Sequence, residues 1–195
     1  AVASRAMFEA CIAAGINHFD TAFVYTDGAS ETLLGEFAAP LREQLVIATK
    51  AAYTGGSGRD NILKAFDISR QRLGMDSVDI LYLHRFDPDT PLAETYDTLA
   101  ELKQQGKIRH VGVSNHAAWQ VMKSVAVAAK RDLTIDILQP MYNLVKRQAE
   151  VELLPMAQDQ DILVAPYSPL GGGLLTGKYA GMDDSSTVGR LAEDS

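Results

Sequence analysis

The sequence predicts an α/β protein, a (β/α)8 TIM barrel, and three observations on its 195 residues lead to that fold. Short apolar runs alternate with amphipathic stretches along the whole chain. The apolar runs are nearly continuous, which is typical of parallel strands that are covered by helices. Polar residues stand at or just past the carboxyl ends of five different runs, and a closed barrel brings such ends to one mouth. An open sheet would scatter them along an edge, and no G-x-G-x-x-G turn follows any run.

Six apolar runs rich in Val, Ile, Leu and Tyr are the predicted strands. Their spacing of about 25–35 residues suits either an open doubly wound sheet or a barrel. Strict alternation with helices predicts parallel pairing through right-handed crossovers. The predicted strands are Ile16–Asp20, Leu45–Thr49, Val78–Leu83, Ile108–Val113, Ile135–Gln139 and Ile162–Tyr167.

Amphipathic stretches predict helices before and between these strands, and three of them have recognisable ends, of which the first is that of Val2–Ala14 at Gly15. The helix Gly58–Leu73 is expected to stop at Gly74, because glycine permits the left-handed conformation that ends a helix. The helix Pro91–Gln105 begins with proline, has Thr90 as its predicted N-cap and ends at Gly106. The remaining predicted helices are Ser30–Phe37, Ala117–Ala129 and Ala149–Gln158.

Composition and charge exclude several classes of protein. A hydrophobic content of 47% is ordinary for a chain that buries a core, which argues against disorder. The 18 Lys and Arg against 25 Asp and Glu give a net charge of −7, which disfavours a nucleic-acid partner. No apolar run approaches the roughly 20 residues of a membrane span, so no membrane partner is expected. The single cysteine, Cys11, excludes a disulfide framework, and without a signal-peptide pattern the expected location is cytoplasmic.

Four residues of different chemistry lie at or after the ends of the first three predicted strands: Asp20, Tyr25, Lys50 and His84. Each alone has an ordinary explanation as a helix cap, a loop residue or a rim aromatic. Together they make a proton-donating device, because the Lys50 ammonium would stabilise the phenolate of Tyr25 and lower the pKa of its phenol. Asp20 would hold Lys50, and His84 would hydrogen-bond a substrate carbonyl. A carbonyl that receives a hydride needs such a device, since its developing alkoxide must take up a proton.

Five segments, in order, resemble motifs of the aldo-keto reductase family. Phe19–Glu31 resembles the segment that bears the family's Asp and Tyr, while Ile47–Lys50 and Leu83–Arg85 resemble its lysine and histidine strands. The resemblance continues through Gly106–Asn115 and ends with Tyr167–Lys178. The order and spacing of the elements agree with the family over residues 2–180.

The resemblance implies an NAD(P)H-dependent reductase that converts an aldehyde or ketone, a small-molecule substrate, into an alcohol. Tyr25 would be the general acid, assisted by Lys50, Asp20 and His84. NADPH is the cofactor that the resemblance implies, with NADH not excluded. The positions that match cofactor-binding residues are Ser114, Asn115 and Gln139 for the nicotinamide carboxamide, Tyr167 beside the nicotinamide ring, and the backbone of Ser168, Leu170 and Gly172 along the pyrophosphate.

The family's barrel has eight strands, and the sequence accounts for six. We therefore expect residues 1–195 to form a single barrel domain that is incomplete at both ends, with the first and last strands absent. The segment that grips the adenosine 2′-phosphate would lie in the last part of the barrel. A preference for NADPH over NADH thus rests on the resemblance alone.

Two other functions remain open. A metal-dependent hydrolase on the same barrel could use His18, Asp20, His84 and Asp87 as ligands, although Lys50 would place a fixed positive charge beside the metal. The preferred interpretation has no metal site. The second alternative is a non-catalytic, cofactor-sensing or channel-associated barrel subunit, in which the same four residues can persist. The sequence does not indicate an oligomeric state.

Overall fold

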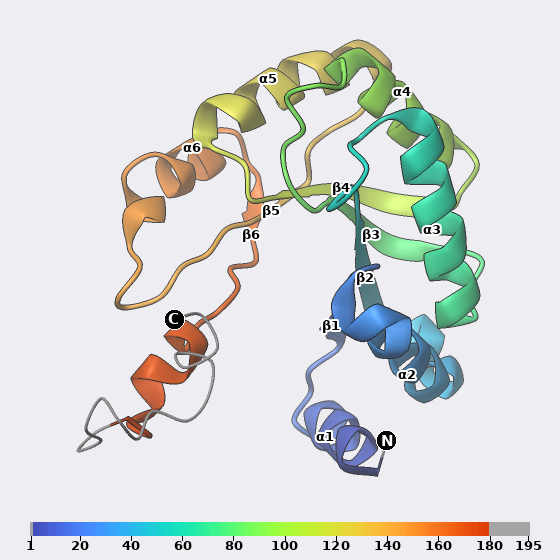
Figure 1. Ribbon diagram of the computed structural model, residues 1–195, viewed down its shortest axis with the longest axis vertical. Coiled ribbons are helices and arrows are strands. Elements are labelled where there is room, and N and C mark those ends of the chain that lie inside the picture. Colours follow the sequence, from blue (N-terminus) through green and yellow to red (C-terminus); the bar gives the residue numbers. More distant parts are fainter. Residues whose placement is uncertain (1, 180–195) are drawn as a thin grey trace. The chain divides into compact units, whose positions relative to one another are not determined.

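Helices and strands alternate along residues 2–179, the part of the chain that the structure, a computed structural model, describes (Figure 1). By its internal contacts the chain divides into two units, Ala1–Ile137 and Leu138–Ser195. Within the described residues, six strands alternate with helices in the order of a partial (β/α)8 barrel, which confirms the predicted fold class.

The first unit is built on parallel strands that pair in sequence order. Asp20 lies opposite Ala48, and Lys50 lies opposite Tyr82. Because neighbouring strands run in the same direction, their carboxyl ends share one edge of the sheet. The strands are β1 (His18–Asp20), β2 (Val46–Ala51), β3 (Val78–Leu83), β4 (Ile108–Ser114) and β5 (Ile137–Gln139), of which the last crosses the boundary between the units.

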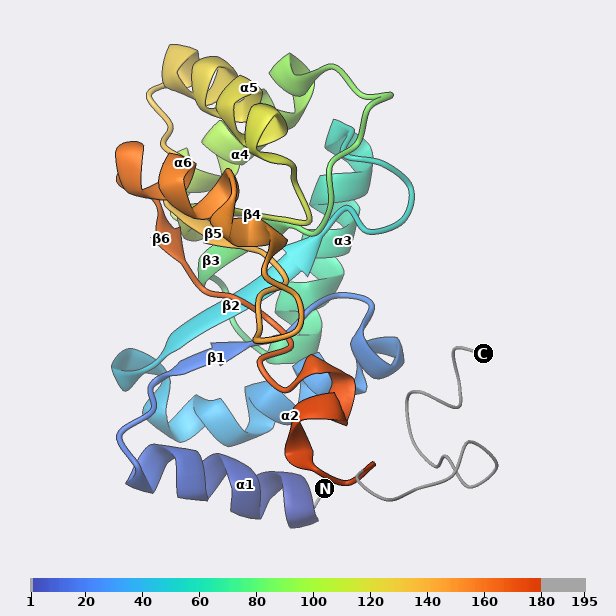
Figure 2. The same cartoon turned by 90° about the vertical axis from the view of Figure 1, so that its left-hand side faces the viewer.

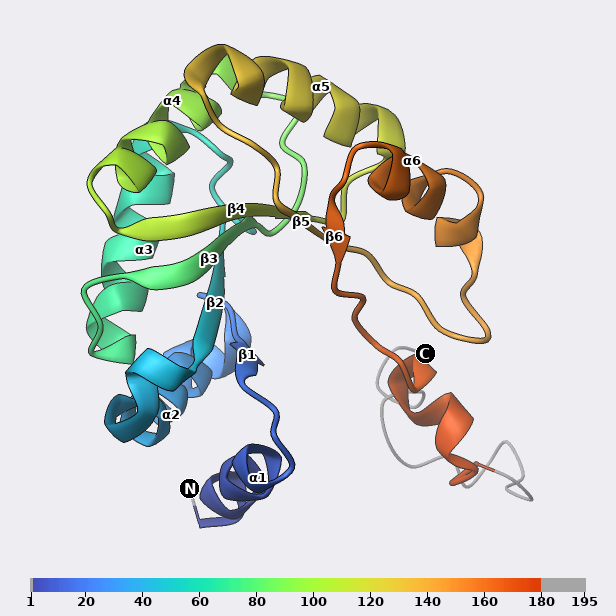
Figure 3. The ribbon, with the colours of Figure 1, turned by 180° about the vertical axis from the view of Figure 1, so that it is seen from behind.

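Helices cover the outer face of this sheet (Figure 3). The third of them ends at Gly74, whose φ of 62° is the left-handed conformation that the sequence predicts there. The helices are α1 (Val2–Ala13), α2 (Ala29–Ala38), α3 (Arg59–Leu73), α4 (Leu92–Gln104) and α5 (Ala118–Ala128). Among residues 2–179 no helix combines the length and the apolar character that a membrane span requires.

The core of the first unit lies between the sheet and these helices. Every residue of β3 is buried, as expected for a strand that is covered on both faces. Phe66 of α3 and Leu99 of α4 are fully buried. Removing each such side chain from water contributes about 2 kcal/mol to the stability of the fold. In Figure 2, α1 and α2 lie beside each other, and the ring centroids of their Phe8 and Phe37 are 5.8 Å apart.

Close packing of α2 against the end of α3 depends on Gly35. A Cβ at Gly35 would collide with the backbone carbonyl of Leu73, so no larger residue fits without moving one helix. This approach brings the first turn of α2 within reach of the last turn of α3.

The second unit contains the end of β5, the short helix α6 (Leu153–Asp159) and the strand β6 (Leu163–Val164). Ala165 N–H donates to Leu138 O at 2.9 Å, and Tyr167 N–H donates to Pro140 O at 2.9 Å. The strand is shorter than the predicted Ile162–Tyr167, although hydrogen bonds to the chain around β5 continue as far as Tyr167. The chain after it includes the 3-10 turn Gly171–Thr176.

Two predictions about helix starts are wrong. Pro91, and not Thr90, is the N-cap of α4, because the Thr90 hydroxyl donates to Asp87 Oδ2 at 2.5 Å instead. The last helix begins at Leu153 and not at residue 149, since Pro155 is tolerated only in the first turn of a helix.

A buried carboxylate ties three strands together at their amino ends, far from the edge where the polar residues gather. Asp79, the second residue of β3, accepts the N–H of Ile47 at 2.9 Å and forms ion pairs with Arg42 and Arg109 at 2.9 Å each. Asp79 is buried, whereas Arg42 is partly buried and Arg109 is exposed, and breaking a buried ion pair by removing one partner costs about 3 kcal/mol.

We expect Asp79→Asn to destabilise the full-length protein by about 3 kcal/mol, because it leaves the Arg42 guanidinium without its buried partner. The measurement is the urea midpoint of unfolding. Asp76→Asn is the matched control, since the Asp76 side chain is fully exposed and its change should cost less than about 1 kcal/mol. Equal midpoints for the two variants would contradict this account.

Candidate active site

The carboxyl edge of the first unit's sheet brings together all four residues that the sequence predicts as catalytic. Asp20 is the last residue of β1, and Tyr25 begins the 3-10 turn Tyr25–Gly28 that follows it. Lys50 lies inside β2 and not just past its end, because that strand continues to Ala51. His84 is the first residue after β3.

Lys50 is the centre of this group. Its Nζ forms an ion pair with Asp20 Oδ2 and donates to Thr21 O at 2.8 Å. The same nitrogen lies 4.8 Å from the centre of the Tyr25 ring. Lys50 is only 1% exposed, and burial lowers the pKa of its ammonium while Asp20 opposes that shift. A positive charge is therefore held beside the tyrosine in a site with little water, where its field is strong.

Tyr25 reaches the surface while Lys50 does not. The Tyr25 side chain is 39% exposed, so a small molecule can approach its ring. Its backbone N–H donates to Ala22 O at 3.0 Å, which fixes the turn after β1. A phenol that is accessible from solvent and lies next to a buried ammonium can pass a proton to a bound substrate.

His84 packs between two tyrosines. Its ring centroid is 5.8 Å from that of Tyr25, edge to face, and 4.8 Å from that of Tyr53. Burial, and then the positive charges of Lys50 and Arg85, lower the pKa of His84 to about 4. The ring is therefore neutral at neutral pH and can donate one hydrogen bond without carrying a charge.

Asn115 lies at the same edge, directly after β4. Its φ of 55° is left-handed, a conformation that asparagine adopts more readily than most residues. Its Nδ2 donates to His84 O at 2.9 Å and to Ser114 Oγ at 3.2 Å. Ser114 is buried and Asn115 is exposed, so an amide stands at the surface of the site beside the histidine segment.

The other residues that are expected to bind a cofactor belong to the second unit. Gln139 is buried at the end of β5. Ser168 has a φ of 57°, and its carbonyl accepts a hydrogen bond from Asn143 Nδ2 at 2.9 Å. Leu170 is exposed, and the half-buried glycines that follow it have positive φ, among them Gly172 at 67°. The predicted role of these residues and of Tyr167 stays a prediction.

Sequence reasoning missed two charged residues behind the site, Glu31 and Arg72. Glu31 is fully buried, accepts from Thr49 Oγ1 at 2.7 Å and pairs with Arg72 at 3.1 Å. One signal was available: Glu31 shares a face of its helix with Gly35 and Ala38, at spacings of four and seven residues. A carboxylate on the buried face of an amphipathic helix needs a partner, although the sequence does not identify that partner.

The turn that carries Tyr25 is strained. Thr26 and Asp27 have φ values of 47° and 51°, left-handed conformations that cost about 1 kcal/mol or more each for residues with a Cβ. Hydrogen bonds to the next helix hold the turn: Ser30 N–H donates to Thr26 Oγ1 at 3.1 Å, and Thr32 Oγ1 donates to Gly28 O at 3.1 Å. Strain of this kind persists only where surrounding contacts impose it, and it clusters at functional sites.

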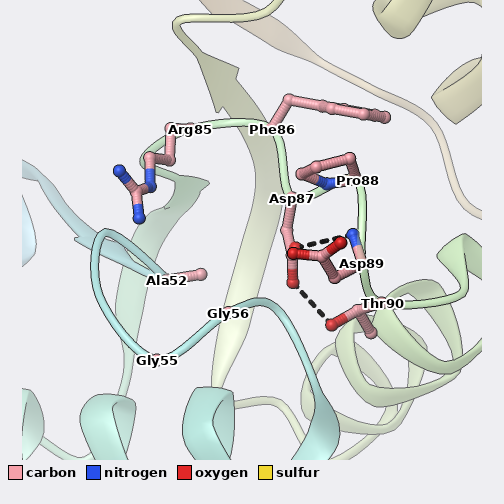
Figure 4. A pocket seen from close by; sticks show the side chains of 9 residues that line it. All are labelled: Ala52, Gly55, Gly56, Arg85, Phe86, Asp87, Pro88, Asp89 and Thr90. Atoms are coloured by element: carbon pink, nitrogen blue, oxygen red, sulfur yellow. Dashed lines mark hydrogen bonds between the residues drawn. The ribbon is translucent and has the colours of Figure 1, made fainter.

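A cavity of about 540 Å³ lies between the loops that follow β2 and β3, and Arg85 is one of the residues that line it (Figure 4). Burial alone would raise the pKa of Asp87, but hydrogen bonds from Thr90 and from the backbone N–H groups of Ser57 and Asp89 lower it to about 2. The cavity is lined by Ala52, Gly55, Gly56, Arg85, Phe86, Asp87, Pro88, Asp89 and Thr90.

The structure places residues that the hydrolase alternative would use as metal ligands in other contacts. Asp87, one of its proposed ligands, is occupied by Ser57 N–H at 2.7 Å and by Thr90. Across residues 2–179 the structure contains no group of three or more His, Cys, Asp and Glu side chains that could hold a metal ion.

Comparison with known proteins gives a consistent result. Residues 2–192 match the model of the aldo/keto reductase family. Aflatoxin B1 aldehyde reductase member 2 of Rattus norvegicus is 38% identical over 185 residues, which cover 92% of this chain and 50% of that protein. L-glyceraldehyde 3-phosphate reductase of Escherichia coli (strain K12) is 36% identical over 189 residues, covering 90% of this chain and 55% of that protein.

A relative of another kind also matches. A probable voltage-gated potassium channel subunit beta of Oryza sativa subsp. japonica is 36% identical over 188 residues, which cover 91% of this chain and 57% of that protein. The chain spans about half the length of the curated relatives it matches. Since the family model extends over residues 2–192 and the strand ends assemble the four expected residues, the chain belongs to the aldo/keto reductase family.

Proposed function

We propose that the protein reduces an aldehyde or ketone to an alcohol, with NADPH as the hydride donor and Tyr25 as the proton donor. The observation that supports this most directly is the buried Lys50 ammonium, which is paired with Asp20 and lies 4.8 Å from the centre of the Tyr25 ring. A phenol with an ordinary pKa of about 10 is a poor acid at neutral pH. A neighbouring cation stabilises the phenolate, so the phenol gives up its proton more readily.

The residues divide the work of the reaction among them. When bound, the nicotinamide supplies a hydride to the carbonyl carbon. His84, neutral at the working pH, donates a hydrogen bond to the carbonyl oxygen and fixes its direction. The Tyr25 O–H transfers its proton to that oxygen as negative charge develops on it, and Lys50 stabilises the phenolate that remains. Asp20 holds Lys50 in place, and solvent returns the proton to the exposed Tyr25.

The side chains at the end of β4 fit a nicotinamide. The amide of Asn115 is exposed beside the histidine segment, and an amide and a hydroxyl offer the donors and acceptors that a carboxamide requires. We therefore assign Ser114 and Asn115 to the carboxamide. In the second unit, Gln139, Tyr167, Ser168, Leu170 and Gly172 remain proposed cofactor contacts, supported by the family resemblance.

A non-catalytic, cofactor-sensing subunit is the second candidate function. A relative named as a probable voltage-gated potassium channel subunit beta favours it. The two candidates share cofactor binding and differ in turnover. A cytoplasmic location, which the sequence predicts, fits either of them.

Replacing Tyr25 with Phe should lower the rate of carbonyl reduction by about 10²- to 10⁴-fold, because the variant has no proton to donate. Affinity for NADPH should stay unchanged, since the phenol is not among the proposed cofactor contacts. The full-length protein is assayed with a panel of aldehydes, ketones and quinones by NADPH consumption, and cofactor binding is followed by fluorescence titration.

Tyr53→Phe is the matched control, because it keeps a ring against His84 and loses only a hydroxyl. Its turnover should stay close to that of the unaltered protein. Full turnover by Tyr25→Phe would remove Tyr25 from its proposed role. Binding of NADPH by the unaltered protein without turnover of any carbonyl would favour the sensing subunit.

The neutral state of His84 has a consequence for stability. Its pKa in the folded protein is about 4, below the ordinary value of 6.5, so the unfolded chain binds its proton first as the pH falls. The free energy of unfolding should therefore decrease as the pH falls from about 6.5 to about 4. Above pH 6.5 the neutral His84 should cause no loss of stability. The buried His116, also with a pKa of about 4, contributes in the same direction.

We expect His84→Gln to remove about half of the pH dependence that the two histidines produce, as measured by urea midpoints at pH 7 and pH 5. His110→Gln is the control, because that side chain is more than half exposed. An unchanged slope in His84→Gln would mean that His84 carries a proton in the folded protein.

A further inference from the structure

An ion pair between the fully buried Glu31 and the partly buried Arg72 connects the turn that carries Tyr25 to the strand that carries Lys50. We infer that Glu31 and Arg72 are positioning residues, which hold the Tyr25 hydroxyl where it can serve as the proton donor. The inference rests on the proposed role of Tyr25, and it adds two residues from α2 and α3 to the machinery of that role.

Glu31 links the ion pair to β2. One carboxylate oxygen accepts the Thr49 hydroxyl at 2.7 Å, and the other pairs with the Arg72 guanidinium at 3.1 Å. Thr49 directly precedes Lys50 in β2, and successive side chains of a strand point to opposite faces. The pair therefore lies on the helix side of the sheet while Lys50 faces the site, so Glu31 acts through position and not by direct contact.

Arg72 links the same pair to the turn after β1. The nitrogen that pairs with Glu31 also donates to Phe23 O at 2.8 Å, two residues before Tyr25. The guanidinium lies 4.8 Å from the centre of the Phe23 ring. Arg72 thus holds the entrance of the turn through both the backbone and the side chain of Phe23.

Gly28 closes the other end of the turn against the same guanidinium. Its φ of 92° is left-handed, and a Cβ built there would collide with Arg72 Cζ and Nε. Arg72 therefore contacts the segment both before and after the strained residues Thr26 and Asp27. Because the strained turn would relax without such contacts, the ion pair fixes where the Tyr25 ring stands relative to Lys50.

A displacement of about 1 Å at a reacting group can cost about a hundredfold in rate. A positioning role therefore predicts a loss in the proton-transfer step, with binding preserved. A merely structural role predicts a smaller fraction of folded protein, in which each folded molecule works at the normal rate.

The test uses Arg72→Met, Arg72→Lys and Gly28→Ala in the full-length protein, with Arg70→Met as the matched control. Arg70 lies on the same helix, and its guanidinium pairs with Asp67 at 2.7 Å. The single-turnover rate of carbonyl reduction is normalised to the NADPH-binding sites found by fluorescence titration. It is measured in H₂O and in D₂O, together with the KM for the carbonyl and the Kd for NADPH.

We expect the normalised rate of Arg72→Met to fall about ten- to a hundredfold, with KM and Kd within about twofold of the unaltered protein. The solvent isotope effect should rise, because transfer of the proton from a misplaced phenol limits the rate. Arg72→Lys should recover part of the loss, and Gly28→Ala should reproduce it while keeping both charges. The Arg70→Met control should keep the rate and the isotope effect of the unaltered protein.

An unchanged normalised rate and isotope effect in the Arg72 and Gly28 variants would overturn the inference. Gly28→Ala and Arg72→Lys decide the question if Arg72→Met does not fold. Failure of the proposed function is separate from these results, because it shows as full turnover by Tyr25→Phe, or as NADPH binding without turnover by the unaltered protein, whatever the ion pair does.

Discussion

The buried ammonium of Lys50 is the constraint on which the site depends. A charge with 1% exposure is costly unless it is paired and hydrogen-bonded, and Asp20 and Thr21 O supply those partners from β1. The partners are available only in the observed register, in which Asp20 lies opposite Ala48 and Phe23 N–H donates to Lys50 O at 3.2 Å. The pairing that compensates the charge therefore also begins the turn that presents Tyr25.

Two other buried charges of the first unit are also compensated by ion pairs and hydrogen bonds, and the two have different roles. At the amino ends of the strands, Asp79 joins β2, β3 and β4 and contributes to stability. On the helix side of the sheet, Glu31 joins β2 to α3 behind the tyrosine turn. In barrels of this class chemistry takes place at the carboxyl ends of the strands, and these two carboxylates illustrate how the remaining positions support that edge.

The sequence predicted an element well wherever the residues that determine it are neighbours in the chain. The predicted strand Val78–Leu83 has the same first and last residues as β3, and α3 ends at Gly74 as predicted. The errors occurred where a distant or neighbouring group competes for the same atoms. Thr90 does not cap α4, because its hydroxyl donates to Asp87 Oδ2 instead.

The sequence by itself determined the order of strands and helices, since apolar periodicity is visible in a linear chain. It also determined that Asp20, Tyr25, Lys50 and His84 lie at or near the ends of three strands. Only the tertiary structure decided which charges are buried and which partners they meet. The neutral state of His84 depends on burial and on Lys50, and Glu31 meets Arg72 from 41 residues away. Burial and pairing arise from contacts between distant segments, and these are settled only when α2 packs on α3 and β1 pairs with β2.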